Sequence, residues 1–216
     1  MSGVRVKICG NTNLADAERA ADLGAWAVGL IFHRPSPRRC PVGEAAAIAA
    51  ALRRRVEVVG VFVNRPLDEV VGRADEVGLS IVQLHGDEGP AYCAEVARRT
   101  GCRVMKARQV RSGADLRALA AFHVDLHLLD AHADGLRGGT GQTFDWALVA
   151  QRRSPVPMVL SGGLTPDNVG EAIARTSPWA VDVASGVEAG PGRKDPERLE
   201  SFFGAVRAAA QPEAVR

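Results

Sequence analysis

Eight short apolar, β-branched runs alternate strictly with eight segments of helical period, which limits the possible folds more than any other feature. This repeat predicts parallel strands joined by helical crossovers. The expected strands span residues 4–8, 26–31, 57–63, 81–84, 103–107, 126–129, 157–160 and 180–183. The expected helices span residues 14–23, 43–52, 67–77, 91–99, 115–122, 145–151, 166–174 and 196–209.

The number of strands decides between the two common parallel α/β architectures. A doubly wound sheet normally has five or six strands, whereas eight strand–helix units close into a barrel. Dividing 216 residues by 8 gives 27 residues per unit, which suits a compact barrel. We therefore expect an α/β fold, a single (β/α)8 TIM barrel domain over residues 1–216, with a frayed tail after about residue 210.

Composition excludes several functional classes. The 27 basic and 25 acidic residues give a net charge of +2, without the clustered excess that binds nucleic acid. No apolar run approaches the roughly 20 residues of a membrane span, and the N-terminus lacks a secretory signal core. The four scattered cysteines form no disulfide framework. We expect a cytoplasmic protein with free thiols that binds neither nucleic acid nor a membrane.

Polar and glycine residues gather where the expected strands end, which is where barrel enzymes place their chemistry. The opposite ends of the strands carry no comparable residues. The strand-end segments are Cys9-Gly10-Asn11, Phe32-His33-Arg34, Asn64-Arg65, His85-Gly86-Asp87, Lys106, Asp130, Ser161-Gly162-Gly163 and Ser185-Gly186. This asymmetry predicts an enzyme.

Strand periodicity places Lys7 and Cys9 of the first strand inside the barrel, because their apolar neighbours must face the helices. A buried lysine needs a partner, and the same parity turns Asp182 of the adjacent eighth strand inward. We therefore expect a Lys7–Asp182 ion pair below the site. The nearby cation should lower the pKa of the Cys9 thiol from about 8.5 and make it a base or nucleophile. The alternative is a small buried hydrophobe.

Asp130 ends an apolar strand, so its carboxyl is either a catalytic acid/base or a cap for the next loop. That loop, residues 131–143, is long and rich in glycine, which fits either a lid over a substrate or a surface loop. His85 contacts substrate or simply packs. None of the five histidines has a metal-binding spacing, so we expect neither a metal nor a cofactor.

Two glycine clusters follow the seventh and eighth strands, at the two loops that often bind phosphate in barrels. Gly162 and Gly163 form the first, and Ser185 and Gly186 belong to the second. Convergent backbone amides at such loops bind anions. An arginine after the second strand, Arg38 or the adjacent Arg39, is suited to a substrate carboxylate or to a solvated surface. The residues alone thus predict proton transfer on a phosphorylated small molecule.

At this point the chain resembles one family, phosphoribosylanthranilate isomerase of tryptophan biosynthesis. The resemblance covers about the whole chain, in order. It rests on KICG at residues 7–10, VGVFVN at 59–64, VQLHGDE at 82–88, GGTGQTFDW at 138–146, LSGGL at 160–164, VDVASGVE at 181–188 and GPGRKD at 190–195. Two positions depart from the family pattern, Asn11 after the KxCG glycine and Ala184 before Ser185.

The resemblance implies a cofactor-free Amadori rearrangement of N-(5-phosphoribosyl)anthranilate to the deoxyribulose phosphate ketone. It implies that Cys9 is the general base that removes the C2 proton and that Asp130 is the general acid that opens the ring. Arg38 would bind the anthranilate carboxylate, and the amides of the two glycine loops would hold the phosphate.

Three other functions would require residues or segments different from these. A histidine-pathway sugar isomerase has paired aspartates at strand ends one and five, where this chain has Cys9 and Lys106. An indole-glycerol-phosphate synthase needs an N-terminal extension and other catalytic residues. A non-catalytic phosphate-binding barrel would be expected to lack Cys9 or Asp130. A barrel of this size is expected as a monomer or a homodimer.

Overall fold

The computed structural model describes residues 3–130, 146–150 and 152–210 of the chain. Eight parallel strands close into a barrel in the order of the sequence, with β8 paired to β1. The predicted (β/α)8 fold is therefore confirmed. The strands are β1 (Arg5–Ile8), β2 (Ala27–Ile31), β3 (Glu57–Phe62), β4 (Ile81–Leu84), β5 (Arg103–Gln109), β6 (Leu126–Asp130), β7 (Met158–Ser161) and β8 (Ala180–Val183).

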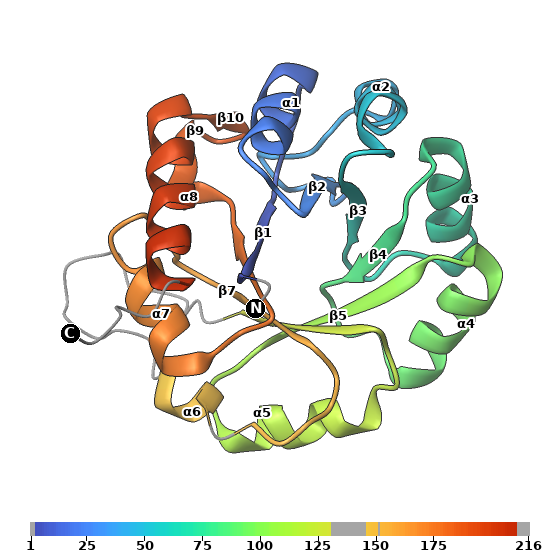
Figure 1. The fold of residues 1–216 in the computed structure, drawn as a ribbon. Coiled ribbons are helices and arrows are strands. Elements are labelled where there is room, and N and C mark those ends of the chain that lie inside the picture. Colours follow the sequence, from blue (N-terminus) through green and yellow to red (C-terminus); the bar gives the residue numbers. More distant parts are fainter. Residues whose placement is uncertain (1–2, 131–145, 151, 211–216) are drawn as a thin grey trace, which may run out of the picture.

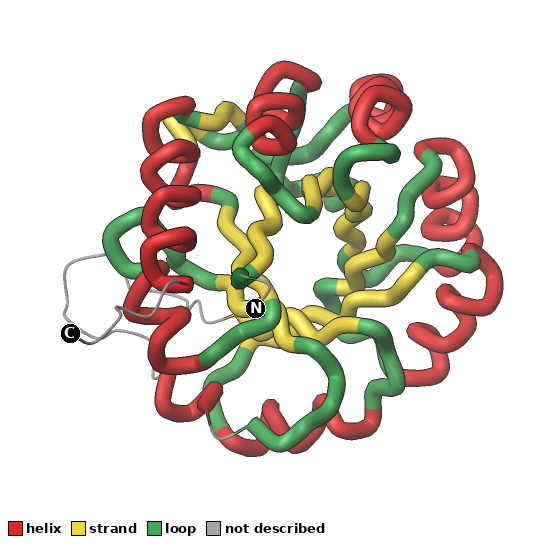
Figure 2. The backbone as a smooth tube through the Cα atoms, in the orientation of Figure 1, coloured by secondary structure: helices red, strands yellow, loops and turns green. Residues whose placement is uncertain are grey.

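A helix follows each strand along the chain and packs outside the ring of strands, as Figures 1 and 2 show. Since each crossover passes over the outer face, the strands lie parallel. The helices are α1 (Leu14–Asp22), α2 (Val42–Leu52), α3 (Leu67–Val77), α4 (Pro90–Thr100), α5 (Gly113–Ala118), α6 (Trp146–Ala150), α7 (Val169–Thr176) and α8 (Pro196–Ala210).

The boundaries differ from the predicted ones by a few residues, and the short elements between β8 and α8 were not predicted. β5 runs two residues further, and the predicted helix over residues 115–122 is α5 followed by the 3₁₀ turn η1 (Leu119–Ala121). Beyond β8, a 3₁₀ turn η2 (Ser185–Val187) leads into an antiparallel hairpin of β9 (Glu188–Gly190) and β10 (Arg193–Lys194). The predicted frayed tail lies outside the described residues.

Two apolar cores hold the barrel together. The larger lies between the strands and the helices, and the smaller fills the inside of the barrel. Trp26 and Trp179 directly precede β2 and β8, with ring centroids 4.8 Å apart in a T-shaped contact. They close the N-terminal end of the barrel, and the Arg5 guanidinium stacks on Trp179 at 4.4 Å. The tryptophan pair packs against the inner core at this end, whereas a cavity lies at the C-terminal end.

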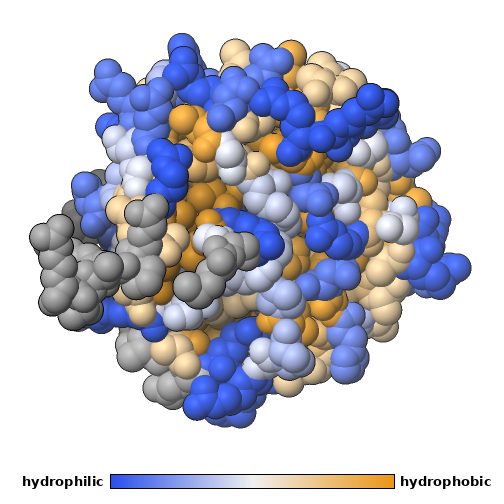
Figure 3. Space-filling model, in the orientation of Figure 1, coloured by the Kyte–Doolittle hydropathy of each residue, from blue (hydrophilic) through white to orange (hydrophobic). Residues whose placement is uncertain are grey.

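Figure 3 shows one face of the molecule, on which many side chains are hydrophilic. In the space-filling view of Figure 3, hydrophilic side chains gather over the outer helices, and hydrophobic ones show mainly between them. Among the described residues, no helix is both long enough and apolar enough to cross a membrane.

His127 fixes β6, the strand that ends in Asp130. Its ring is buried, Nδ1 lies 2.9 Å from Arg152 Nη2, and Nε2 lies 3.3 Å from the Phe122 carbonyl oxygen. Since Arg152 only donates, Nδ1 must accept, and the ring is neutral with its proton on Nε2. Burial, aided by Arg152, lowers the pKa of His127 to about 4.

This burial predicts a stability change with pH. Between the unfolded pKa of 6.5 and the folded pKa of about 4, only the unfolded chain gains a proton at His127. The stability that the neutral ring provides is therefore present above pH 6.5 and lost as pH falls toward 4, by about 3 kcal/mol. Urea unfolding at a series of pH values measures it. A His127→Gln variant should lack this part of the slope; an unchanged slope would contradict the assignment.

Candidate active site

A cavity of about 270 Å³ opens at the C-terminal end of the barrel and brings most of the predicted site residues together. Gly186 lines the neighbouring pocket with Gly163 and Ser185, and Lys7 lies buried beneath. The residues that line the cavity are Cys9, Ile31, Ser36, Arg38, Val61, Gln83, His85, Asp130, Ser161, Gly162, Gly163, Leu164, Asp182, Val183, Ala184 and Ser185.

The predicted Lys7–Asp182 ion pair is present across the seam between β1 and β8. The two residues are in register, and Lys7 Nζ lies 2.7 Å from Asp182 Oδ1, with both side chains buried. Ser161 donates a hydrogen bond to the other carboxylate oxygen at 3.2 Å. Burial disfavours the Lys7 ammonium, but Asp182 and Cys9 outweigh it and raise the pKa of Lys7. The lysine therefore remains charged below the cavity.

Cys9 points into the barrel as predicted, but the expected direction of its pKa shift is wrong. Burial raises the pKa of the thiol above its ordinary value, although Lys7 acts in the opposite direction. Sequence indicated the nearby cation but not how completely the thiol is buried. The thiol fits because β2 has a glycine beside it: a Cβ at Gly29 would lie only 2.7 Å from Cys9 Sγ.

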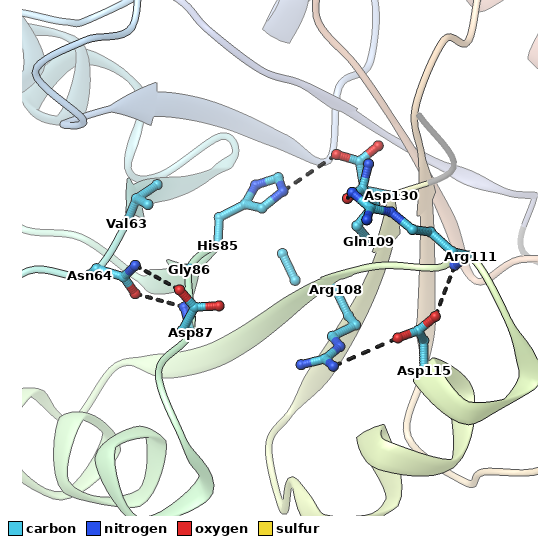
Figure 4. A pocket seen from close by; sticks show the side chains of 11 residues that line it. Val63, Asn64, His85, Gly86, Asp87, Arg108, Gln109, Arg111, Asp115 and Asp130 are labelled. Carbon is cyan, nitrogen blue, oxygen red and sulfur yellow. Dashed lines mark hydrogen bonds and ion pairs between the residues drawn. The ribbon is translucent and has the colours of Figure 1, made fainter. Parts of the chain in front are cut away.

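Asp130 and His85 face each other across the mouth of the barrel (Figure 4), with His85 Nε2 3.4 Å from Asp130 Oδ2. Behind His85, the amide of Gln83 lies 3.4 Å from Nδ1. Gln83 is buried, and its Oε1 has no hydrogen-bond partner among the described residues. Gln83 was not predicted as a site residue, although a polar amide between the apolar residues of a strand could have indicated one. The expected lid, residues 131–143, lies outside the described residues.

His85 and Asp130 also line a second, more polar pocket of about 580 Å³ beside the first. Figure 4 shows its side chains, which come from β5, from the loops after β3, β4 and β5, from α5 and from the end of β6. Polar contacts fix its rim, including an Asn64–Asp87 hydrogen bond of 3.0 Å and an Arg108–Asp115 contact of 3.7 Å. The two residues therefore stand between a small deep cavity and a wider outer one.

Arg38, and not Arg39, lines the cavity. Its guanidinium makes a two-pronged contact with the buried Glu188 carboxylate, through Nε at 2.8 Å and Nη2 at 2.7 Å. Arg39 is exposed and forms a backbone bridge with Ile31. The structure thus resolves which of the two adjacent arginines reaches the site.

The two glycine clusters both line the site, and each has positions that favour glycine. Gly162 and Gly163 have φ angles of 95° and 64°, in the left-handed region that favours glycine. A Cβ at Gly186 would overlap the carbonyl oxygen of Leu164. Among the described residues, the Gly162 and Gly163 amides have no hydrogen-bond acceptor. Free amides beside a glycine-rich turn are suited to an anion.

No described group of three or more His, Cys, Asp or Glu side chains is arranged to hold a metal ion. The site instead combines a buried thiol, a carboxyl, an arginine and two glycine-rich loops. Such a set can move protons on a substrate that carries two negative groups.

Comparison with known proteins identifies relatives of this chain. Residues 6–205 match the family model of N-(5′-phosphoribosyl)anthranilate (PRA) isomerase. The chain is 49% identical over 199 residues to the N-(5′-phosphoribosyl)anthranilate isomerase of Citrifermentans bemidjiense, covering 92% of this chain and 95% of that one.

Solved structures agree. The phosphoribosyl anthranilate isomerase of Thermotoga maritima superposes with a TM-score of 0.85 at 42% identity, covering 95% of this chain and 99% of that one. A phosphoribosyl anthranilate isomerase bound to reduced 1-(o-carboxyphenylamino)-1-deoxyribulose 5-phosphate superposes with a TM-score of 0.82 at 41% identity, with the same coverages.

The seam pair predicts a stability effect. Lys7→Met leaves the Asp182 carboxylate buried without its cation, which should lower the free energy of unfolding by about 3–5 kcal/mol. The control is Arg19→Met, which removes the exposed ion pair with Glu200 and should cost less than about 1 kcal/mol. Urea denaturation compares the two. Equal losses in the free energy of unfolding would show that the buried ion pair contributes no more to stability than the exposed one.

Proposed function

The chain belongs to the N-(5′-phosphoribosyl)anthranilate isomerase family, and from that premise we propose how its residues carry out the isomerisation. The enzyme converts an aminoaldose phosphate into the corresponding aminoketose phosphate, an Amadori rearrangement in tryptophan biosynthesis. The observation that carries the assignment of roles is the meeting of Cys9, Asp130, Arg38 and the glycine loops in one cavity.

Asp130 is the general acid in this proposal. Its proton goes to the furanose ring oxygen as the C1–O bond breaks and the nitrogen lone pair forms a C1=N bond. The Cys9 thiolate then removes the C2 proton, the C2–H electrons form a C1=C2 bond, and the C1=N electrons return to nitrogen to give the enolamine. The enolamine becomes the ketone when C1 gains a proton and the C2 hydroxyl loses its own. Both groups line the same cavity, as a substrate bridging them requires. These steps need no cofactor.

Arg38 binds the anthranilate carboxylate. Glu188 occupies Nε and Nη2, and among the described residues Nη1 has no hydrogen-bond partner. Glu188 therefore orients the guanidinium and leaves one nitrogen for the substrate. An arginine held in this way recognises a planar carboxylate better than a lysine would.

The Gly162-Gly163 turn and the Ser185-Gly186 turn hold the phosphate through backbone amides. The loops meet at the ends of β7 and β8, where the Gly162 and Gly163 amides have no acceptor in the part of the chain that the structure describes. Because backbone groups make the contacts, Ala184 in place of a serine leaves them intact. A related isomerase has been solved with a phosphorylated ligand, reduced 1-(o-carboxyphenylamino)-1-deoxyribulose 5-phosphate, which supports the proposal of a phosphate site in this family.

The roles predict the outcome of two substitutions. Cys9→Ala removes the base and Asp130→Asn removes the acid, so each should lower kcat by about 10²- to 10⁴-fold. Loss of the fluorescence of phosphoribosylanthranilate generated in situ measures turnover, after subtraction of the enzyme-free rate. Wild-type kcat/KM should rise with pH above neutrality, because burial raises the pKa of the Cys9 thiol. Near-normal turnover in either variant would remove that residue from its role.

A second prediction concerns the space beside the thiol. Gly29→Ala places a methyl carbon 2.7 Å from Cys9 Sγ, so the base must move, and kcat should fall at least about tenfold. Gly43→Ala is the matched control, because a Cβ there meets nothing within 4 Å, and its kcat should equal that of the wild type. The same assay compares them. Full activity in Gly29→Ala would show that the thiol position is not critical.

A further inference from the structure

The chain has only three lysines, and all three are buried. Arginine supplies the other 24 of its 27 basic residues. Each lysine contacts a carboxylate at hydrogen-bonding distance: Lys7 with Asp182, Lys106 with Glu88, and Lys194 with Glu188. A lysine ammonium is a compact charge with three donors, whereas arginine is a wide planar fork. Lysine is thus used where a compact buried cation is needed.

Lys194 lies in β10, in the hairpin that the sequence did not predict, and its ammonium is enclosed by acceptors. Nζ donates to the backbone carbonyl of Cys9 at 2.6 Å, to that of Ala184 at 3.3 Å, and to Glu188 Oε1 at 2.9 Å. The three donors of the ammonium match these three acceptors. One side chain thereby joins the ends of β1 and β8 to the hairpin.

Glu188 lies between Lys194 and Arg38 and contacts both. Its Oε1 accepts from Lys194, while Arg38 donates to both of its oxygens. The side chain is almost fully buried. A single carboxylate thus links the arginine at the cavity wall to the lysine under Cys9.

We propose that Lys194 and Glu188 are positioning residues for the isomerisation, Lys194 acting on Cys9 and Glu188 on Arg38. Lys194 holds the Cys9 backbone and sets a second positive charge near its thiol. Glu188 holds the guanidinium in the direction that receives the substrate carboxylate. The inference rests on the proposed roles of Cys9 and Arg38.

The charges around the thiol support this role. Lys7 of β1 faces Asp182 of β8, and Lys194 and Arg38 share the one carboxylate of Glu188. Three cations therefore face two carboxylates, and the surplus positive charge favours a thiolate over a thiol. Burial, and to a smaller extent Asp182, raise the pKa of Cys9, whereas Lys7 and Lys194 lower it. Lys194 thus offsets part of the burial that makes the base hard to ionise.

Lys194→Met removes the second cation, and Lys106→Met is its matched control. Both variants lose a buried lysine and strand a buried glutamate, but Lys106 contacts Glu88 and Gly86 rather than Cys9. The rate of iodoacetamide alkylation of Cys9, located by peptide mass spectrometry, is followed against pH beside the pH profile of kcat/KM. Thermal unfolding checks that each variant folds.

The expected results differ in sign between variants. Lys194→Met should raise the alkylation midpoint of Cys9 by about one pH unit and lower kcat/KM at neutral pH about tenfold, with recovery at higher pH. Glu188→Gln removes a negative charge instead, so it should lower the midpoint while raising KM through Arg38. Lys106→Met should leave the midpoint where it is in the wild type.

An unchanged midpoint in Lys194→Met, or equal shifts in Lys194→Met and Lys106→Met, would overturn the inference. If Lys194→Met does not fold, Glu188→Gln decides: an upward or absent shift overturns the inference, and a downward one supports it. The proposed roles fail by a different result, namely full turnover in Cys9→Ala. The alkylation data do not depend on turnover, so the two failures are distinguishable.

Discussion

The barrel depends on its seam, where the first and last strands meet, and a buried ion pair lies at that seam. β1 and β8 are about 175 residues apart in the chain, yet Lys7 and Asp182 stand side by side at 2.7 Å. A buried pair of this kind adds little net stability over an apolar pair, but it penalises every wrong register, because either charge alone would be buried without a partner. The pair therefore specifies how the ring closes.

The hairpin of β9 and β10 reinforces the same place from outside the ring. Lys194 of the hairpin donates to the carbonyl groups that follow β1 and β8. Two lysines therefore stabilise the seam, Lys7 inside the barrel and Lys194 from the hairpin. The charges of both lysines act on the Cys9 thiol. The part of the structure that closes the barrel is also the part that surrounds the base, which makes the stability of the seam and the chemistry of Cys9 inseparable.

Sequence periodicity was enough to predict the ring, its order and which side chains of β1 and β8 face inward. It was enough because alternation is a local property, and the apolar residues leave Lys7 and Asp182 only one side to occupy. The hairpin was missed because its strands have three and two residues, too few for a period to appear. The contact of Lys194 with Cys9 spans 185 positions, and no local pattern reveals it.

Two other results needed three-dimensional information. Adjacent Arg38 and Arg39 are equivalent in sequence, and only the structure shows that Arg38 lines the cavity while Arg39 is exposed. The pKa of Cys9 depends on a competition between burial and nearby charge, and the sequence reveals the charge far more readily than the burial. The direction of such a pKa shift therefore depends on how tightly the group is packed, which the sequence does not show.

The tryptophan pair at the N-terminal end has a kinetic consequence. Trp26 and Trp179 close that end in a T-shaped contact, and the inner core fills the space above them. The site cavity lies at the opposite, C-terminal end of the barrel, so the product leaves by the same opening through which the next substrate enters. A product molecule that is still bound therefore prevents the next substrate molecule from binding.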